Sequence, residues 1–214
     1  MIPDLFLDEK RSVQFAPGAM LLEGFALPNE AEILVAINAV IDAAPLRHMV
    51  TPNGYSMSVA MTNCGAAGWV SDHAKGYRYE RNDPQTGKTW PEMPEVLLKL
   101  AGRAASEAGY YNYLPDVCLI NSYTPGAKLA LHQDNDEADF TAPIVSVSLG
   151  LPATFLFGGL TRQNKPKKIP LWHGDVFVFG GDSRMAFHGV APLKEGHHPL
   201  LGNRRINLTF RKAL

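Results

Sequence analysis

The sequence predicts an α+β, mainly β fold built around a double-stranded β-helix, or jelly roll, with N-terminal helices and a lid loop region. Eight short apolar segments, separated by Gly, Pro, Asn or Asp, follow one another in the second half of the chain, which is typical of a double-sheet jelly roll. Two stretches with the periodicity of amphipathic helices precede them. We therefore expect one domain over residues 1–214, in which about 1–115 form the helical and lid elaboration and about 116–214 form the jelly-roll core.

The first helix is expected to begin at Asn29, after an irregular segment over residues 1–28 that includes a short strand at 19–22. Asn29 can serve as the N-cap, and Glu32, three residues later, as its partner in a capping box. Pro45 ends the helix, because proline cannot continue one. Between these limits apolar residues recur at helical spacing and predict one buried face: Ile33, Leu34, Ile37, Val40 and Ile41.

Residues 50–63 change the pattern from helix to strand. A turn signature at 51–55 precedes apolar residues that alternate with small or polar ones, which is strand periodicity. The next stretch is expected to be a loop that interleaves aromatic with basic residues: Trp69, His73, Lys75, Tyr77, Arg78, Tyr79 and Arg81. This combination suits stacking on a nucleobase together with contacts to phosphate. The same rings also suit a lid that packs on the core, and both interpretations stay open.

A second helix is expected over residues 92–108, with Gly109 as its stop signal. After it, helical periodicity gives way to strand periodicity. We expect these eight strands at 116–123, 128–134, 143–150, 153–158, 168–171, 175–179, 184–190 and 203–211.

The bulk composition limits the partners and compartments of the protein. The formal net charge is −1 and the pI is near 6.6, so the chain lacks the basic excess of a dedicated duplex-binding domain. No apolar run approaches the roughly 18 residues that cross a bilayer, and the acidic, proline-containing N-terminus is unlike a signal peptide. Two cysteines without a CxxC motif predict neither a disulfide framework nor a zinc site, and we expect a cytoplasmic protein without membrane contact.

Two His-x-Asp tripeptides compete as metal-binding motifs. In His132-Gln133-Asp134, strand alternation would place the imidazole and the carboxylate on one face. Together with one distant histidine they would form the facial triad of non-haem Fe(II) sites. The second tripeptide, at residues 173–175, has a central glycine that weakens a strand, so we interpret it as a structural turn. For the distant histidine we choose His188, because it lies on a predicted strand and is followed by a glycine.

The last strand separates polar from apolar residues by parity. Arg205, Asn207, Thr209 and Arg211 share one face, whereas Ile206, Leu208 and Phe210 share the other. An antiparallel strand with one solvated face would give the same pattern. The strand at 117–123 repeats it, because Asn121 and Tyr123 lie on one parity. A polar lining on two strands suits a small dianion, since the planar fork of arginine binds carboxylates through two hydrogen bonds.

The order His132-x-Asp134, His188, Arg205-x-Asn207-x-x-x-Arg211 resembles the AlkB family of Fe(II)/2-oxoglutarate-dependent dioxygenases, and its bacterial alkylation-repair branch in particular. Asn121-x-Tyr123-x-Pro125-Gly126 matches the same family. The resemblance implies that His132, Asp134 and His188 bind Fe(II), and that 2-oxoglutarate and O₂ are co-substrates. It implies that Arg205, with Tyr123, binds the distal carboxylate of 2-oxoglutarate and that Arg211 binds the one beside the iron, with Asn121 and Asn207 in the same pocket. Substrate contacts would come from Trp69, Tyr77, Arg78, Tyr79, Asp136 and Arg162.

By the same resemblance, the activity is oxidative removal of methyl groups from N1-methyladenine and N3-methylcytosine in DNA, and in RNA as well. The base must be flipped out or single-stranded to be reached. We expect a monomer. Two rival functions stay open, namely a 2-oxoglutarate-dependent hydroxylase of a small molecule or protein, which the missing basic excess favours, and a jelly-roll binding module without catalysis.

Overall fold

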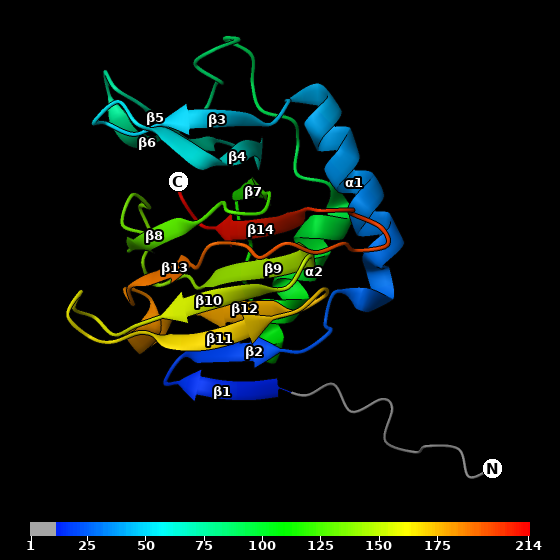
Figure 1. The fold of residues 1–214 in the computed structure, drawn as a ribbon, viewed down its shortest axis with the longest axis vertical. Helices are drawn as coiled ribbons and strands as arrows, with labels where there is room; N and C mark the ends of the chain where they lie inside the picture. Colours follow the sequence, from blue (N-terminus) through cyan, green and yellow to red (C-terminus); the bar gives the residue numbers. More distant parts are fainter. Residues whose placement is uncertain (1–11) are drawn as a thin grey trace.

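Two antiparallel β-sheets that face each other form the centre of the computed structural model, which describes residues 12–214 (Figure 1). The larger sheet contains, in spatial order, β1 (Ser12–Ala16), β2 (Ala19–Leu22), β12 (Val176–Phe179), β9 (Ile144–Gly150), β14 (Arg205–Arg211), β7 (Val117–Tyr123), β4 (Ser56–Gly65) and β3 (Arg47–Val50). The smaller sheet contains β11 (Lys167–Leu171), β10 (Ala153–Phe157), β13 (His188–Val190) and β8 (Leu129–His132). The predicted jelly roll is confirmed. No helix within residues 12–214 is long and apolar enough to cross a membrane.

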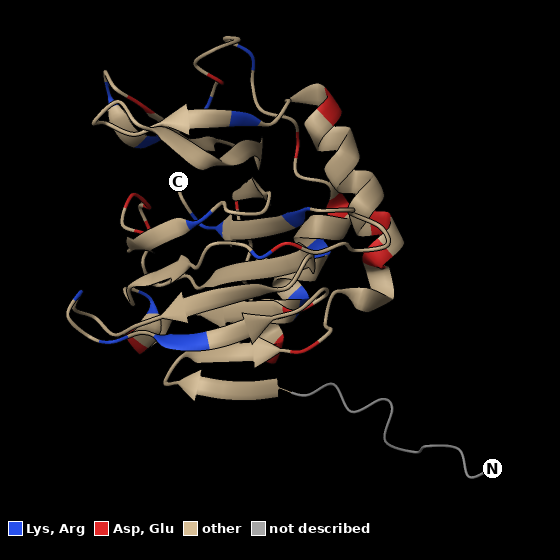
Figure 2. Ribbon diagram, viewed as in Figure 1, with Lys and Arg blue, Asp and Glu red and all other residues tan. Residues whose placement is uncertain are grey.

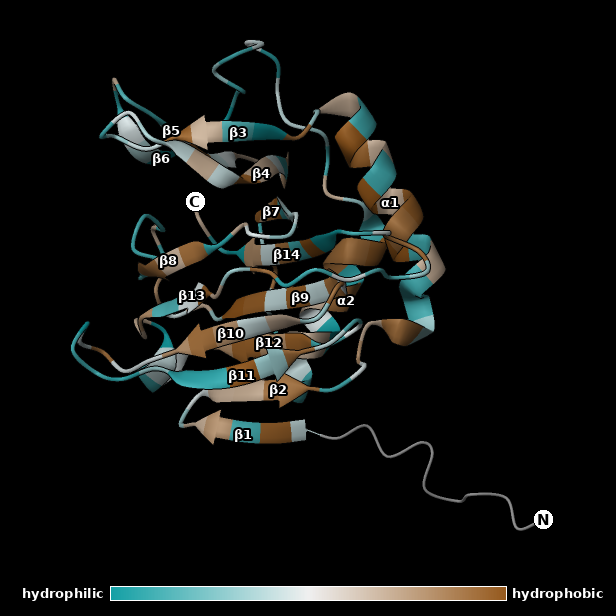
Figure 3. Cartoon of the chain, viewed as in Figure 1, coloured by the Kyte–Doolittle hydropathy of each residue, from teal (hydrophilic) through white to brown (hydrophobic). Residues whose placement is uncertain are grey.

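The larger sheet is covered on both faces, and strand alternation explains how. On β12, Phe177 and Phe179 point toward the smaller sheet, where they contact Phe155 and Phe157. The intervening Val176 and Val178 belong to the second core, which packs beneath helices α1 (Glu30–Ala43) and α2 (Glu95–Glu107). Apolar residues accordingly dominate β9, β10 and β12 in Figure 3. A strand buried on both faces reads as a continuous apolar run, and that is the pattern of residues 176–179.

Helix α1 begins where the sequence predicts but without the predicted capping bonds, whereas α2 begins later than predicted. Asn29 is the N-cap residue of α1, but it makes no side-chain capping bond, so the predicted capping box with Glu32 is wrong. The Asn29 Oδ1 instead accepts a hydrogen bond from Arg103 Nη1 of α2, at 3.1 Å. Helix α2 begins at Glu95, later than the expected residue 92, because Pro94 occupies its N-cap in an extended conformation. Gly109 ends the helix as predicted, with φ +88°.

The stretch expected to be a lid loop forms a β-hairpin of β5 (Gly68–Asp72) and β6 (Gly76–Glu80), here called the lid hairpin. Strands β1 and β3 were also not predicted, because half-exposed edge strands carry a weak apolar pattern. They form the two edges of the larger sheet. Strands from before and after residue 115 therefore pair within this one sheet. Residues 1–11, including the N-terminus compared with a signal peptide, lie outside the described residues.

The strands that carry the two candidate histidines are shorter than predicted. Strand β8 ends at His132, and β13 covers only His188–Val190. The segment before β13 instead forms a turn that follows the 3-10 helix Gly181–Ser183, and in this turn the Ala186 N–H donates to the carbonyl of Ser183. The predicted strand at 184–190 is therefore wrong over its first half. Because β-periodicity cannot distinguish a short strand from a buried turn, only the tertiary contacts decide this boundary.

The second tripeptide is a structural turn, as predicted. Gly174 adopts φ +88°, a conformation that favours glycine. The Asp175 carboxylate accepts hydrogen bonds from the N–H groups of Gly24 and Trp172, at 2.9 and 2.7 Å. The His173 Nδ1 accepts a hydrogen bond from the Gly150 N–H at 2.7 Å, and its Nε2 contacts Glu30. With Nδ1 acting as acceptor, Nε2 carries the proton, so this neutral imidazole has no free lone pair for a metal.

Asp175→Ala is expected to destabilise the fold without affecting metal binding. The substitution leaves two backbone N–H groups without their acceptor, and each such loss costs about 1–3 kcal/mol when the group is buried. Urea denaturation should show a lower free energy of unfolding, whereas exposed Asp182→Ala should leave it unchanged. Equal stability of the two variants would contradict the structural role of this turn.

Candidate metal and co-substrate site

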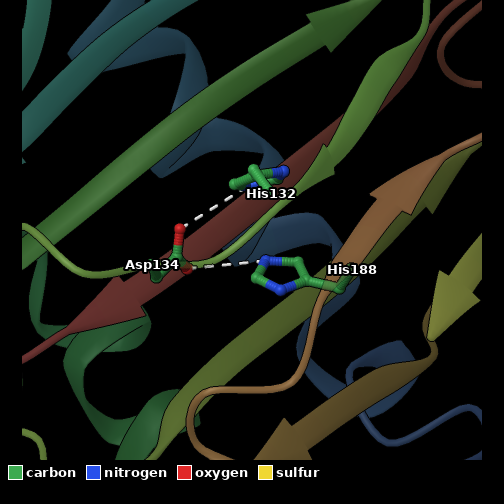
Figure 4. Close-up of side chains that lie close together, drawn as sticks. All are labelled: His132, Asp134 and His188. Carbon is green, nitrogen blue, oxygen red and sulfur yellow. Dashed lines mark ion pairs between the residues drawn. The ribbon is translucent and has the colours of Figure 1, made fainter. Parts of the chain in front are cut away.

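His132, Asp134 and His188 converge at the open end of the two sheets (Figure 4). The two histidines lie directly opposite each other on the neighbouring strands β8 and β13. Their Nε2 atoms lie 3.5 and 3.6 Å from the two carboxylate oxygens of Asp134. One ligand atom from each of the three residues lies within 4.8 Å of the others, so one metal ion can contact all three. Two imidazoles and one carboxylate form the donor set of the facial triad of non-haem iron sites.

The tautomer of each histidine is determined by its backbone contact. The Nδ1 of His132 lies 2.9 Å from the carbonyl oxygen of Ala130, and the Nδ1 of His188 lies 3.0 Å from that of Ala186. A carbonyl oxygen can only accept a hydrogen bond, so Nδ1 carries the proton and Nε2 presents its lone pair. Burial lowers the pKa of His188, with a further contribution from His132, which favours the neutral ligand form.

Asp134 lies beyond the end of β8 and depends on two arginines for its position. Its Oδ2 accepts hydrogen bonds from Nε and Nη2 of Arg211, at 3.0 and 2.8 Å. Its main-chain oxygen accepts one from Arg184 Nη1 at 2.9 Å. Burial opposes ionisation of Asp134, but Arg211 and the two histidines hold the pKa of this carboxyl well below its usual range. The carboxylate is therefore ionised and available to a cation.

The polar face of β14 is buried, which excludes the alternative of a solvated face. Arg205 is 1% exposed and Arg211 is 6% exposed. Arg205 donates from Nε to Ser148 Oγ at 3.0 Å and lies over the ring of Tyr123, 4.9 Å from its centroid. The Nη1 atoms of both arginines have no hydrogen-bond partner among residues 12–214. Buried arginine donors without acceptors are costly, and the carboxylates of a bound diacid would satisfy them. The residues present therefore fit 2-oxoglutarate as well as Fe(II).

Asn207 has a different environment from the two arginines. Its Nδ2 donates to Ser146 Oγ and to the Val147 carbonyl, both at 2.9 Å, and its Oδ1 accepts from Asn121 Nδ2 at 3.2 Å. Its hydrogen-bonding capacity is therefore used inside the protein. Asn121 retains an Oδ1 atom without a partner among the described residues, so Asn207 orients Asn121 within the pocket.

One cavity of about 850 Å³ joins the triad to the lid hairpin. Four of the six predicted substrate residues line it, namely Trp69, Tyr77, Asp136 and Arg162. The rings of Trp69 and Tyr77 are stacked, with centroids 5.5 Å apart and planes at 17°. The Trp69 indole also donates from Nε1 to Asp136 Oδ2 at 2.9 Å.

Arg78 and Tyr79 are not among the cavity-lining residues. Arg78 forms ion pairs within the lid hairpin, with Asp72 and Glu80, both at 2.7 Å. The Tyr79 hydroxyl donates to Glu137 Oε1 at 2.6 Å. The two side chains therefore shape the lid hairpin and connect it to the segment after Asp134.

Two charged residues of the site were not singled out from the sequence. Glu137 and Arg184 are 6% and 3% exposed, and they pair at 3.0 Å next to Asp134. The sequence around each of them gives little indication of a role in the site. Glu137 ends an acidic run that reads as solvated loop, and Arg184 lies in a segment predicted to be strand. Buried charges are found paired, but the sequence does not reveal which charges are buried.

Comparison with known proteins agrees with this geometry. The family model of the 2OG-Fe(II) oxygenase superfamily matches residues 18–211. The chain is 56% identical over 211 residues to the alpha-ketoglutarate-dependent dioxygenase AlkB of Escherichia coli (strain K12), covering 98% of this chain and 97% of that one. It is 42% identical over 224 residues to the DNA N(6)-methyladenine demethylase ALKBH1D of Arabidopsis thaliana, covering 91% of this chain and 49% of that one.

A solved structure of OsALKBH1 has the same fold, with a TM-score of 0.81 and 31% identity, and covers 94% of this chain and 100% of its own. The residues that match the family model include the triad and both pocket arginines. The protein therefore belongs to the 2OG-Fe(II) oxygenase superfamily and, within it, to the AlkB family, whose chemistry uses Fe(II), 2-oxoglutarate and O₂.

Proposed function

We propose that the protein oxidatively demethylates N-alkylated bases, N1-methyladenine and N3-methylcytosine, in DNA and also in RNA. The observation that carries this proposal is the position of the Trp69–Tyr77 stack and Asp136 on the wall of the cavity that holds the triad. An aromatic surface suits the face of a base, and a carboxylate suits its exocyclic amine and its positive charge. The relative in Arabidopsis thaliana, a DNA N(6)-methyladenine demethylase, supports a nucleic-acid substrate.

In this proposal His132, Asp134 and His188 hold Fe(II) through Nε2, a carboxylate oxygen and Nε2. Arg205 and Tyr123 bind the distal carboxylate of 2-oxoglutarate, and Arg211 binds the carboxylate beside the metal. Arg211 can do so because Nε and Nη2 contact Asp134 while Nη1 stays available. When bound, iron with 2-oxoglutarate and O₂ supplies an oxidation that yields succinate, CO₂ and a hydroxymethyl group, which leaves the base as formaldehyde.

The lid hairpin and the cavity wall select the base. A flipped or single-stranded base stacks on Trp69, and its exocyclic amine donates to Asp136 in competition with the Trp69 indole. Arg162, whose guanidinium lies 5.1 Å from the ring centroid of Phe187, supports the opposite wall. Basic residues lie on β11, on the loop between β10 and β11 and around the lid hairpin, whereas α1 carries acidic residues (Figure 2). Local basic groups at this end suit phosphate contacts despite a net charge of −1.

The decisive experiment uses oligonucleotides that carry one N1-methyladenine, prepared as DNA and as RNA. With Fe(II), 2-oxoglutarate and O₂, mass spectrometry should show loss of one methyl group and one formaldehyde released per lesion. If the oligonucleotide keeps its methyl group while an added small molecule or protein is hydroxylated and 2-oxoglutarate is converted to succinate, the small-molecule or protein hydroxylase is favoured. Binding of 2-oxoglutarate with no succinate formed under any condition would favour the binding module. The ratio of turnover on DNA and RNA gives the preferred nucleic acid.

Trp69→Ala is expected to raise the KM for the methylated oligonucleotide about 5- to 150-fold, because stacking on one base contributes about 1–3 kcal/mol. Trp69→Phe loses the hydrogen bond to Asp136 but keeps an aromatic face on which a base can stack. Its KM for the oligonucleotide should therefore rise much less than that of Trp69→Ala. The KM for 2-oxoglutarate should stay unchanged in both variants. Steady-state kinetics with each co-substrate varied in turn measures this, and an equal effect on both KM values would contradict a substrate role for Trp69.

We also propose that the protein acts as a monomer in the cytoplasm. The triad, the arginine pocket and the lid hairpin all come from one chain, so the proposed reaction needs no second copy. Cys64 and Cys118 are buried and carry free thiols although they face each other on β4 and β7, which suits a reducing compartment.

A further inference from the structure

Four buried charged groups form a continuous network behind the triad. Arg211 bridges two carboxylates, donating to Asp134 Oδ2 at 2.8 Å and lying 3.3 Å from Glu137 Oε1. Arg184 connects the same two residues, donating from Nη1 to the main-chain oxygen of Asp134 at 2.9 Å and from Nη2 to the Glu137 carboxylate at 3.0 Å. Two positive and two negative side chains balance each other in this network. Each is less than a tenth exposed, so each needs its partners.

Glu137 is the member of this network that also contacts the lid hairpin. Its Oε1 accepts a hydrogen bond from the Tyr79 hydroxyl on β6 at 2.6 Å. Burial raises the pKa of Tyr79 above its ordinary value, so the phenol keeps its proton and remains the donor. Asp136, one residue earlier, accepts from the Trp69 indole on β5 at 2.9 Å. The segment after Asp134 therefore holds both strands of the lid hairpin, one through a partly buried bond and one through an exposed bond.

The Trp69–Asp136 and Tyr79–Glu137 hydrogen bonds differ in whether a bound base can replace them. The Trp69–Asp136 bond faces the cavity, so a bound base can replace it. Glu137 and Tyr79 are not among the cavity-lining residues, so their bond persists whether or not a base is bound. The path from β6 through Tyr79, Glu137 and Arg211 to Asp134 is thus the lasting contact between the lid hairpin and the metal-binding carboxylate.

We infer that Glu137 is a positioning residue that couples the lid hairpin to Asp134 and directs the free Nη1 of Arg211 toward the co-substrate. The inference deepens the proposed site and rests on the assignment of metal and 2-oxoglutarate to it. Arg211 contacts Glu137 and Asp134 from one side of its guanidinium, so its rotation is restricted by both. Arg184 neutralises the second carboxylate charge and holds Glu137 in place. A fixed conformation of the lid hairpin then strengthens metal binding, and metal binding in turn stabilises that conformation.

The first test measures this coupling in the wild-type protein and in Tyr79→Phe, which removes one hydroxyl from an otherwise intact core. Binding of Mn(II) and 2-oxoglutarate should slow amide hydrogen–deuterium exchange of residues 68–80 about fivefold or more in the wild type, the lower range of measured allosteric couplings. In Tyr79→Phe this added protection should largely disappear. Because coupling is reciprocal, Mn(II) affinity in the presence of 2-oxoglutarate should fall by a similar factor. Equal protection in the two proteins, or none in the wild type, would overturn the inference.

The second test uses Glu137→Gln, which keeps the size of the side chain and removes its charge. Loss of an outer partner of a metal ligand typically weakens metal binding 10- to 100-fold, and we expect Mn(II) affinity to fall within that range. The KM for 2-oxoglutarate should rise as well, since Arg211 is no longer held. Asp139→Asn, on the same segment and hydrogen-bonded to Thr141 instead of to the network, should change neither value.

A purely structural role for Glu137 predicts a lower melting temperature with unchanged Mn(II) affinity and unchanged KM, and that result would overturn the inference. If Glu137→Gln does not fold, the exchange experiment on Tyr79→Phe still decides. Amide exchange and Mn(II) affinity are measured without the nucleic-acid substrate, so these two readouts do not depend on the demethylation assay. Failure of the demethylation assay and failure of this coupling are therefore distinguishable.

Discussion

Iron binding and turnover should both be lost in His132→Ala and retained in His173→Ala. The first substitution removes one of the three ligand side chains. The Nε2 of His132 has a free lone pair because its Nδ1 donates to the Ala130 carbonyl. Loss of a mere outer partner costs 10- to 100-fold in metal affinity, so loss of a ligand should cost more than about 100-fold. His173 belongs to the other His-x-Asp tripeptide, where both ring nitrogens are already used, by Gly150 and Glu30.

The order of the two variants should be reversed for stability, with His173→Ala losing more free energy of unfolding than His132→Ala. His173→Ala leaves the Gly150 N–H without its acceptor, which costs about 1–3 kcal/mol. His132 is about a third exposed and makes one backbone bond, so its removal should cost little stability. Isothermal titration with Fe(II) under anaerobic conditions and urea denaturation give the two quantities. Equal losses of iron affinity in both variants would show that the wrong tripeptide was chosen.

Arg205→Met is expected to raise the KM for 2-oxoglutarate about 30- to 5000-fold, because losing one partner of a buried charge pair costs about 2–5 kcal/mol. Arg205 is the largest fully buried side chain, and its Nη1 has no acceptor among the described residues until a carboxylate arrives. Arg205→Lys keeps the charge but loses the planar fork, so we expect an intermediate KM. Metal affinity without 2-oxoglutarate should stay unchanged, because Arg205 makes no contact with the triad.

The neighbouring Arg204 provides the matched control, since it is exposed while Arg205 is buried. Arg204→Met should leave the KM for 2-oxoglutarate unchanged. Measuring succinate formation over a range of 2-oxoglutarate concentrations separates KM from kcat. If the two substitutions had the same effect, a general loss of positive charge would explain it, and the assignment of Arg205 to the distal carboxylate would be wrong.

The sequence predicted the jelly roll because most of its strands are short, strongly apolar and separated by turn residues. It also predicted one polar face on β14, since alternation on a strand is strict. It did not predict the lid hairpin, because aromatic residues share one face of β5 and β6 and charged residues lie on the other, and this mixture is also typical of a loop. The sequence left two interpretations of the polar β14 face open, an inward-facing lining and a solvated face, and the structure shows that both faces of the strand are buried.

At the metal site, too, the sequence predicts some features and the tertiary structure decides others. The sequence by itself determined which residue types are available, in which order, and that the glycine of the second tripeptide disfavours a strand. His132 and Asp134 do not share a strand face, contrary to the prediction, because β8 ends at His132. Only the tertiary structure brings Asp134 to the histidines, through Arg211 and Arg184, which lie 77 and 50 residues away along the chain. Local periodicity determines strands, whereas the position of a buried charge depends on partners that the fold alone assembles.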